Sequence, residues 1–144
     1  MKNRIVGLIP VKGNSERVKK KNTRKFGSSS LFLHKLKQLK KTKYFDEIIV
    51  SSEDKQILKI AKKEGFSIHI RDKKFSTNSI PMSDVYRNIA SEIKGEYIAW
   101  INVTNPLFKT EYYDQAIKKF KSINKKKFDC LLSSFLIQDY FFFK

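Results

Sequence analysis

The sequence has few cysteine, histidine and glycine residues, and these shortages exclude several classes of protein. Its single cysteine, Cys130, excludes an internal disulfide and favours a reducing cytoplasm. Cys130 lies in the mostly apolar stretch 128–132, so we expect a core thiol and not a nucleophile. His34 and His69 have no cluster of cysteine, histidine or acidic residues beside them, so the sequence predicts no zinc site.

Long apolar runs are also missing. No run approaches the ~20 residues that a helix needs to cross a bilayer. Residues 1–10 lead directly into a short strand and lack the apolar core of a signal peptide. We therefore expect a cytoplasmic protein with no membrane partner.

What the sequence has in excess is positive charge. There are 31 Lys and Arg residues against 14 Asp and Glu residues, which gives a net charge of +17. Such a charge suits phosphates or polyanions as partners. The lysines are spread along the whole chain, however, and this spread favours a diffuse background charge over a dedicated nucleic-acid face.

The hydrophobic pattern alternates between strands and helices. Strands are predicted at residues 4–9, 47–52, 66–71, 96–103 and 128–137, and helices at residues 30–41, 54–65, 83–93 and 110–123. The candidate N-caps are Ser28, Ser29 or Ser30, then Asp54, then Ser83. This alternation predicts a Rossmann-like α/β fold, with a mostly parallel sheet and helices on both faces. No repeat or linker divides residues 1–144, so we expect a single nucleotide-binding domain.

Two polar loops follow predicted strands, at residues 10–22 and 102–108. Ligands of parallel sheets bind outside the carboxyl ends of the strands, so these loops are expected to form a cleft. The first loop contains only Gly13 and matches neither GxxxxGK[ST] nor GxGxxG. Its backbone can still form an anion nest near Gly13, Asn14 and Ser15. A solvated basic turn without a ligand remains the alternative.

Several segments of the sequence, taken in order, resemble the acylneuraminate cytidylyltransferase family, which includes the CMP-sialic acid synthetases. In "IPVKGNSERVKKKNTRKFG" the residues in register are Asn14, Ser15, Arg17, Val18, Lys21 and Asn22. The other similar segments are "FDEIIVSSED", Arg71 after the third strand, "FSTNSIPMSDV", "INVTNPLF" and "FDCLLSSF". Together they span nearly the whole chain, as the N-terminal portion of that family.

The resemblance implies transfer of a cytidylyl group from CTP to the anomeric hydroxyl of a nonulosonic acid, with release of pyrophosphate. It implies that the first loop is basic because it holds the leaving phosphates, with Lys21 as the principal catalytic cation and Lys12 as the second. The implied substrate-binding residues are Gly13, Asn14, Ser15, Asn22, Arg71, Met82, Ser83 and Asn102. Of these, Arg71, Met82 and Ser83 would line the cytidine or ribose, and Asn102 stands where the family has a base-reading Gln.

The sequence departs from the family at four positions within the similar segments. Lys12 replaces an Arg and lacks its bidentate fork, Glu16 replaces a Lys, Asn78 an Asp, and Phe108 an Arg. The sequence also ends where the family continues for most of another half-length. The Mg²⁺ that the family uses is therefore expected to have its ligands outside this chain, as are the sugar-contacting segments and the dimerisation arm. We do not expect the family's homodimer from residues 1–144.

Two alternatives stay open at this point. One is a related sugar nucleotidyltransferase of the octulosonate or spore-coat type. The other is a non-catalytic, basic α/β module that binds nucleic acid or a protein partner, although no RNP-like aromatic pattern or helix-turn-helix spacing supports it. The sequence also leaves open a truncated product, a fragment, or one half of a split enzyme.

Overall fold

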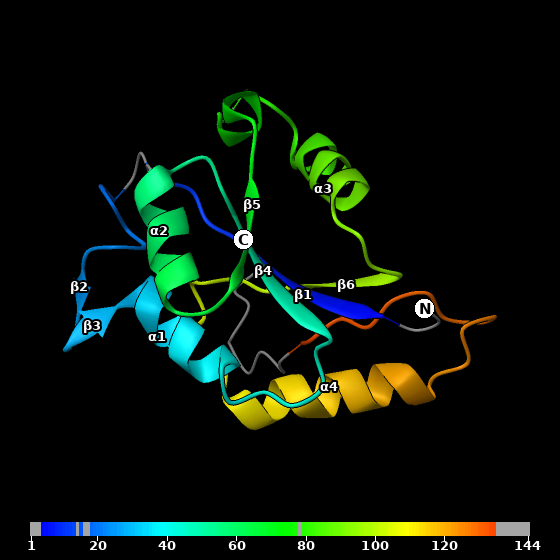
Figure 1. Cartoon of the computed structure of the whole chain (residues 1–144). Coiled ribbons are helices and arrows are strands. Elements are labelled where there is room, and N and C mark those ends of the chain that lie inside the picture. Colours follow the sequence, from blue (N-terminus) through cyan, green and yellow to red (C-terminus); the bar gives the residue numbers. More distant parts are fainter. Residues whose placement is uncertain (1–3, 14, 16–17, 78, 135–144) are drawn as a thin grey trace, which may run out of the picture.

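A computed structural model describes residues 4–13, 15, 18–77 and 79–134 of the chain. At its centre is a parallel sheet in the order β5-β4-β1-β6 (Figure 1). Its strands are β1 (Ile5–Pro10), β4 (Glu47–Ser52), β5 (Ser67–Ile70) and β6 (Tyr97–Trp100). A short antiparallel hairpin pairs β2 (Lys25–Phe26) with β3 (Ser29–Ser30). The predicted parallel α/β fold is confirmed.

Helices cover both faces of this sheet. They are α1 (Leu31–Leu39), α2 (Lys55–Lys63), α3 (Met82–Glu92) and α4 (Thr110–Ser122), with a 3₁₀ turn, η1 (Lys73–Ser76). On one face Ile9 and Val50 pack with side chains of α1, α2 and α4. On the other face Val6 and Leu8 pack with α3. Because successive residues of β1 point to opposite faces, one buried strand serves both cores.

Local polar contacts explain where the helices begin. Ser30 Oγ accepts a hydrogen bond from the N–H of Leu33 at 3.2 Å, and Asp54 Oδ1 accepts one from the N–H of Gln56 at 2.7 Å. These two predicted N-caps are confirmed. The third is wrong, because α3 begins one residue earlier and Pro81 holds the N-cap position without a side-chain bond. Ser83 therefore lies within the first turn of α3.

The predicted last strand is not present over residues 128–134, which have no regular structure. β6 is an edge strand of the sheet, and residues 128–134 form no ladder with it. Its apolar side chains are exposed, Leu132 to 84%. Cys130 is also exposed, so the expectation of a core thiol is wrong. Residues 135–137 of that predicted strand lie outside the described residues.

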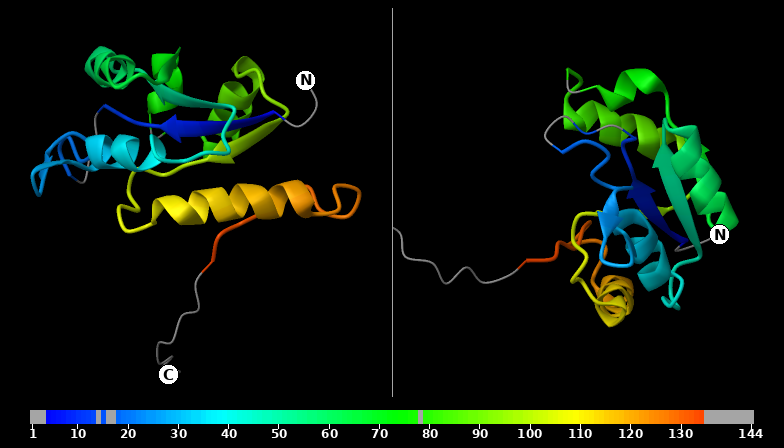
Figure 2. Two further views of the ribbon diagram at one scale, coloured as in Figure 1. Left: turned by 60° about the horizontal axis from the view of Figure 1, so that its bottom comes forward. Right: turned by 90° about the vertical axis from the view of Figure 1, so that its left-hand side faces the viewer.

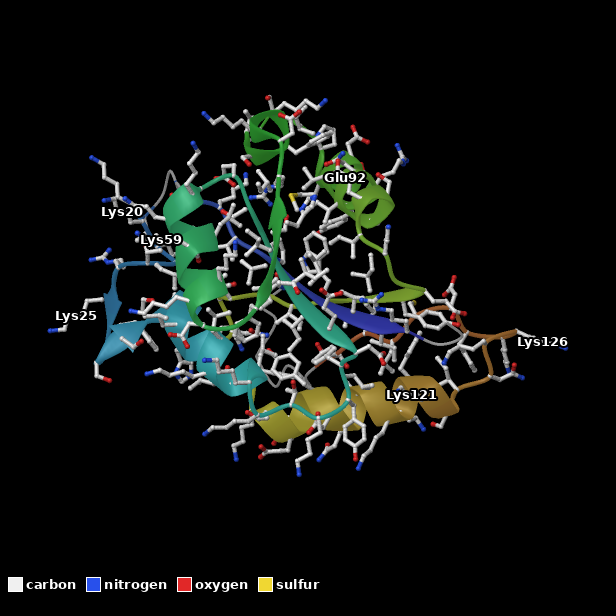
Figure 3. All side chains as sticks on the ribbon, in the orientation of Figure 1. Lys20, Lys25, Lys59, Glu92, Lys121 and Lys126 are labelled. Atoms are coloured by element: carbon white, nitrogen blue, oxygen red, sulfur yellow. The ribbon has the colours of Figure 1, made fainter. Side chains whose placement is uncertain are left out.

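None of the helices in the described ranges has both the length and the apolar character needed to cross a membrane. The lysines that Figure 3 labels lie on opposite sides of the molecule, with Lys20, Lys25 and Lys59 on one side and Lys121 and Lys126 on the other. This arrangement suits a positive charge that is spread over the surface.

Candidate functional site

The order of the strands places the candidate site at the carboxyl ends of β1 and β6. The chain passes from β1 outward to β4 and β5, and then returns to the other side of β1 to form β6. The direction of winding therefore reverses between β1 and β6, which is where ligands of such sheets bind. The carboxyl end of β1, the β2–β3 hairpin and the loop before α4 lie at the same end of the molecule (Figure 2).

Both predicted loops are anchored at this edge by backbone hydrogen bonds. Val11 N–H donates to the carbonyl of Ser51 at 2.9 Å, which ties the start of the first loop to β4. Ile101 N–H donates to the carbonyl of Leu8 at 2.8 Å, which ties the start of the second loop to β1. The next residue, Asn102, is exposed directly beyond β6.

Gly13 packs against Asp54, the N-cap of α2. A Cβ atom at this position would lie 2.6 Å from Cβ of Asp54 and 2.9 Å from its Cγ. No ordinary side chain tolerates such an approach, so a glycine is required here. The N–H of Gly13 donates to Oε1 of Glu53 at 2.8 Å. Asn14 lies outside the described residues, and Ser15 is half-buried.

Asn22 closes the first loop. Its side-chain Nδ2 donates to the carbonyl of Lys12 at 3.2 Å, and its backbone carbonyl accepts from the N–H of Phe32 at 2.9 Å. The side chain is 8% exposed, and Oδ1 is buried without a hydrogen-bond partner. Exchanging the side-chain oxygen and nitrogen would not satisfy both atoms, because the atom that now donates to the Lys12 carbonyl would become an oxygen facing an oxygen that can only accept. Asn22 therefore ends the loop with one unused acceptor.

The cations of this loop differ in their surroundings. Lys21 is half-buried, whereas Lys19 and Lys20 are exposed. Figure 3 shows Lys20 pointing away from the body of the molecule. Nζ of Lys12 donates a long hydrogen bond to the carbonyl of Thr77 at 3.4 Å, so the loop after β1 reaches the segment before α3.

Arg71 is held by contacts within the protein. It is 3% exposed, and its Nη2 donates to Oε2 of Glu53 at 2.6 Å and to the carbonyl of Val11 at 3.0 Å. Its Nε donates to Oγ of Ser76 at 3.2 Å. Burial alone would raise the pKa of Glu53, but the hydrogen bonds from Arg71, Gly13 and Ser76 lower it below its ordinary value. The guanidinium thus fixes the backbone next to Lys12.

Met82 and Ser83 are exposed in the first turn of α3. Hydrogen bonds to Glu53, to the carbonyl of Val11 and between Asn22 and Lys12 bring Lys12, Gly13, Asn22 and Arg71 into one connected group. Met82, Ser83 and Asn102 follow strands of the same sheet but make no described hydrogen bond to that group.

Sequence reasoning missed Glu53. Its only signal in the sequence was its position as an acidic residue directly after a buried strand. Sequence reasoning also missed Lys35, which is 0% exposed on α1. Its Nζ donates to the carbonyl of Asn105 at 3.0 Å and to the hydroxyl of Tyr113 at 2.9 Å. The signal for Lys35 was its spacing, because it lies three residues after Phe32 on the buried stripe of the helix.

No group of three or more histidine, cysteine or acidic side chains that could hold a metal ion occurs among the described residues. Asp54 caps α2, and Glu53 is paired with Arg71. The described residues at this edge therefore offer no ligand set for the Mg²⁺ that the resemblance implies, and we assign no step of a reaction to it.

A hollow of about 400 Å³ lies at the opposite end of the sheet. Glu47 and Ser67, at the amino ends of β4 and β5, contribute to its lining together with Leu39, Phe45 and Phe66. It is therefore separate from the loops that follow β1 and β6.

Comparison with known proteins gives a consistent result. A family model described as cytidylyltransferase matches residues 6–135. Pseudaminic acid cytidylyltransferase of Campylobacter jejuni subsp. jejuni serotype O:2 is 28% identical over 127 residues, covering 84% of this chain and 54% of that protein. CMP-N,N'-diacetyllegionaminic acid synthase of Legionella pneumophila subsp. pneumophila is 26% identical over 131 residues, covering 85% of this chain and 55% of that protein.

Among solved structures, CMP:2-keto-3-deoxy-manno-octonic acid synthetase complexed with CTP aligns with a TM-score of 0.69. The sequence identity is 11%, and the alignment covers 83% of this chain and 48% of that one, so this likeness shows the fold alone. The chain spans about half the length of the curated relatives it matches.

Proposed function

The chain belongs to the cytidylyltransferase family, and we propose that it forms the CTP-binding part of an enzyme that transfers a cytidylyl group from CTP to a nonulosonic acid. Pyrophosphate is the leaving group of this reaction. The relatives named above act on pseudaminic and diacetyllegionaminic acids, which supports a substrate of this class. We treat residues 1–144 as one nucleotide-binding domain and expect it to work in the cytoplasm, where CTP is available.

The observation that carries the proposal is the closed loop between Lys12 and Asn22 at the carboxyl end of β1. The hydrogen bond between these residues fixes both ends of a basic loop at the point where the winding of the sheet reverses. Transfer of a phosphoryl-type group depends mainly on positioning and on neutralising charge. Lys21 and Lys12 would supply that charge to the leaving phosphates, and backbone N–H groups near Gly13 and Ser15 would add donors.

Asn22 would recognise a different part of the ligand. Its unused Oδ1 is an acceptor, and phosphate oxygens are also acceptors at neutral pH. A ligand hydroxyl or amino group that reaches this oxygen would satisfy it, whereas a phosphate would not. We therefore assign Asn22 to the nucleoside side of the loop.

The other side chains would act on the nucleoside from neighbouring strands. Met82 and Ser83 would line the ribose or cytosine from the first turn of α3, and Asn102 would present its amide to the base. Arg71 would shape this wall through Val11 and Glu53, because its guanidinium is already engaged by them. The sugar acid and the Mg²⁺ would be held by groups outside the described residues.

Titration calorimetry of residues 1–144 with CTP, UTP and ATP tests the nucleotide assignment. We expect CTP to bind more tightly than the other two, because Asn102 would contact the base. CTP and UTP differ only in the base, so this pair isolates that contact. A gel shift with RNA tests the alternative of a basic nucleic-acid module. RNA binding without any preference among the three nucleotides would contradict the proposal.

Release of pyrophosphate, measured with CTP and a panel of sugar acids, tests the transfer reaction. The panel would contain pseudaminic, legionaminic, N-acetylneuraminic and octulosonic acids, so that the related octulosonate activity is tested in the same assay. For residues 1–144 alone we expect CTP binding without efficient turnover, since the described residues supply no metal clamp. Turnover at an ordinary enzyme rate of ~10 s⁻¹ would show that this expectation is wrong.

A further inference from the structure

We propose that Lys35 is a positioning residue that fixes the loop after β6 and thereby sets the choice of nucleotide base by Asn102. This inference rests on the proposed function, since it assumes that CTP binds between the loops after β1 and β6. It concerns a residue of α1 whose side chain contacts the loop after β6 at Asn105.

Lys35 is completely buried, and its ammonium group holds two different elements. Nζ donates to the carbonyl of Asn105 at 3.0 Å and to the hydroxyl of Tyr113 at 2.9 Å, and it lies 5.2 Å from the centre of the Tyr113 ring. Asn105 belongs to the loop after β6, and Tyr113 belongs to α4. No carboxylate of the described residues lies within ion-pair distance of Lys35.

Two neighbours of Lys35 on α1 hold the next carbonyl of the same loop. Nε2 of Gln38 donates to the carbonyl of Pro106 at 2.8 Å, and Nε2 of His34 lies 3.1 Å from the same oxygen. The hydroxyl of Thr110 returns a hydrogen bond to the carbonyl of Gln38 at 3.1 Å. One helix therefore clamps consecutive carbonyls of the loop with three side chains.

This clamp lies close to Asn102 along the chain. Ile101 is fixed to β1 through its hydrogen bond to Leu8, and Asn105 is fixed to α1 through Lys35. Only three residues, 102–104, lie between these two anchors. Such a short span has few conformations, so moving either anchor moves the amide of Asn102.

The same helix is connected to the first loop. Phe32, at the start of α1, donates its N–H to the carbonyl of Asn22 at 2.9 Å. The helix thus links the loop that would hold the phosphates to the loop that would hold the base. Lys35 is the buried polar contact in the middle of that link.

A lysine is a costly choice for this position. Burial lowers the pKa of Lys35 to about 8, because the charged form loses its hydration and gains no anionic partner. An apolar side chain of similar length would fill the same space without this cost. The cost is understandable if the two donated hydrogen bonds are needed to hold the loop.

The test compares Lys35→Met with Lys37→Met, a matched control at an exposed position of the same helix. Affinities for CTP and UTP are measured by calorimetry on residues 1–144, and folding is checked by thermal unfolding. We expect Lys35→Met to remain folded and to lower the ratio of CTP affinity to UTP affinity by about 2- to 30-fold, the usual range for coupling through packed contacts. Lys37→Met should leave the ratio unchanged.

A second variant guards against a folding failure of the first. Tyr113→Phe removes one acceptor of Nζ and keeps the ring, and we expect a smaller change of the ratio in the same direction. An unchanged ratio in Lys35→Met, or equal losses for both nucleotides, would overturn the positioning role while leaving the proposed function in place. An unchanged ratio in Tyr113→Phe would overturn it in the same way if Lys35→Met does not fold. Absence of CTP binding by the wild-type chain would instead reject the proposed function, and the role of Lys35 with it.

Discussion

The carboxylate of Glu53 joins the buried guanidinium of Arg71 to the loop after β1. Oε2 accepts a hydrogen bond from Nη2 of Arg71 at 2.6 Å, and Oε1 accepts one from the N–H of Gly13 at 2.8 Å. The side chain of Glu53 is 15% exposed, and that of Arg71 is 2% exposed. One ion pair therefore holds β4, the end of β5 and the start of the candidate phosphate loop together.

Replacing Glu53 should destabilise the protein strongly. Glu53→Gln keeps the size of the side chain and can still accept from Gly13, but it leaves the Arg71 charge buried without a partner. We expect the free energy of unfolding at pH 7 to fall by about 3 kcal/mol, as is usual when one partner of a buried pair is removed. Urea unfolding measures this. Glu64→Gln, which breaks the exposed pair with Lys40, is the control and should have a much smaller effect.

The same pair predicts how stability depends on acid. Because the pKa of Glu53 is lowered on folding, its stabilisation is complete above its unfolded value of about 4.3 and is lost as the pH falls through the lower folded value. The difference in stability between wild type and Glu53→Gln should therefore be constant from pH 7 to about pH 5. It should shrink at lower pH. A difference that stays constant down to pH 2 would contradict a charged pair.

Gly13→Ala should destabilise the protein through a steric conflict. The new Cβ would lie 2.6 Å from Cβ of Asp54, so the loop or the start of α2 must move. We expect a loss of about 1–3 kcal/mol, the usual range for overpacking. Asp54→Gly removes the opposing Cβ and, as an N-cap replacement, should cost only a few tenths of a kcal/mol.

The double variant Gly13→Ala/Asp54→Gly provides the decisive comparison. If the conflict is the cause, the double variant should recover about 1 kcal/mol or more relative to the sum of the single changes, as for residues in direct contact. Simple additivity in thermal unfolding would show that Gly13 is required for another reason.

The sequence predicted the parallel sheet and its helices because the pattern of buried residues is local. Ile9 and Val50 in their strands, and Phe32 and Leu36 in α1, follow the periods of their elements and form one core. The strand predicted at 128–137 had the same apolar character. Over 128–134 it is absent: the segment forms no ladder with the edge strand β6, and pairing between distant segments is not contained in a local apolar pattern.

In the candidate site too, local patterns could be predicted from the sequence and contacts between distant residues could not. The two loops could be located from the sequence because each follows a strand that a local pattern predicts, and the strand order then places them on either side of the switch point between β1 and β6. Lys35 could not be assigned a partner, because its acceptors lie 70 and 78 residues further along the chain. The pairing of Glu53 with Arg71 also depends on the packing of β4 beside β5, which spacing along the chain does not reveal.

The lowered pKa of Lys35 predicts that the free energy of unfolding rises above pH 8. This pKa is about 8 in the folded protein and about 10.4 when unfolded. Between these values the unfolded chain holds more protons, so stability rises with pH. Lys35→Met lacks this contribution, and we expect the stability difference between variant and wild type to change by about 2 kcal/mol between pH 7.5 and pH 9.5.

Guanidinium unfolding at the two pH values measures this difference. The window ends below pH 10 because Tyr113, whose pKa is raised to about 12, has the opposite effect once unfolded tyrosine begins to ionise. Lys37→Met is again the control, because Lys37 is exposed. An equal pH dependence for Lys35→Met and wild type would mean that Lys35 is not buried in solution.

Lys21→Ala tests whether the basic loop holds a triphosphate at a defined place. Lys21 is half-buried, while Lys19 and Lys20 are exposed, so the three neighbours separate a placed charge from a diffuse one. If Lys21 faces the leaving phosphates, its loss should weaken CTP binding by about 10- to 150-fold, the equivalent of a hydrogen bond to a charged group. The loss should be smaller for CMP, which lacks the β and γ phosphates. Lys19→Ala and Lys20→Ala should have little effect in the same calorimetric titration. Equal losses for all three variants would mean that the nucleotide is attracted by net charge alone, and the assignment of Lys21 would then be wrong.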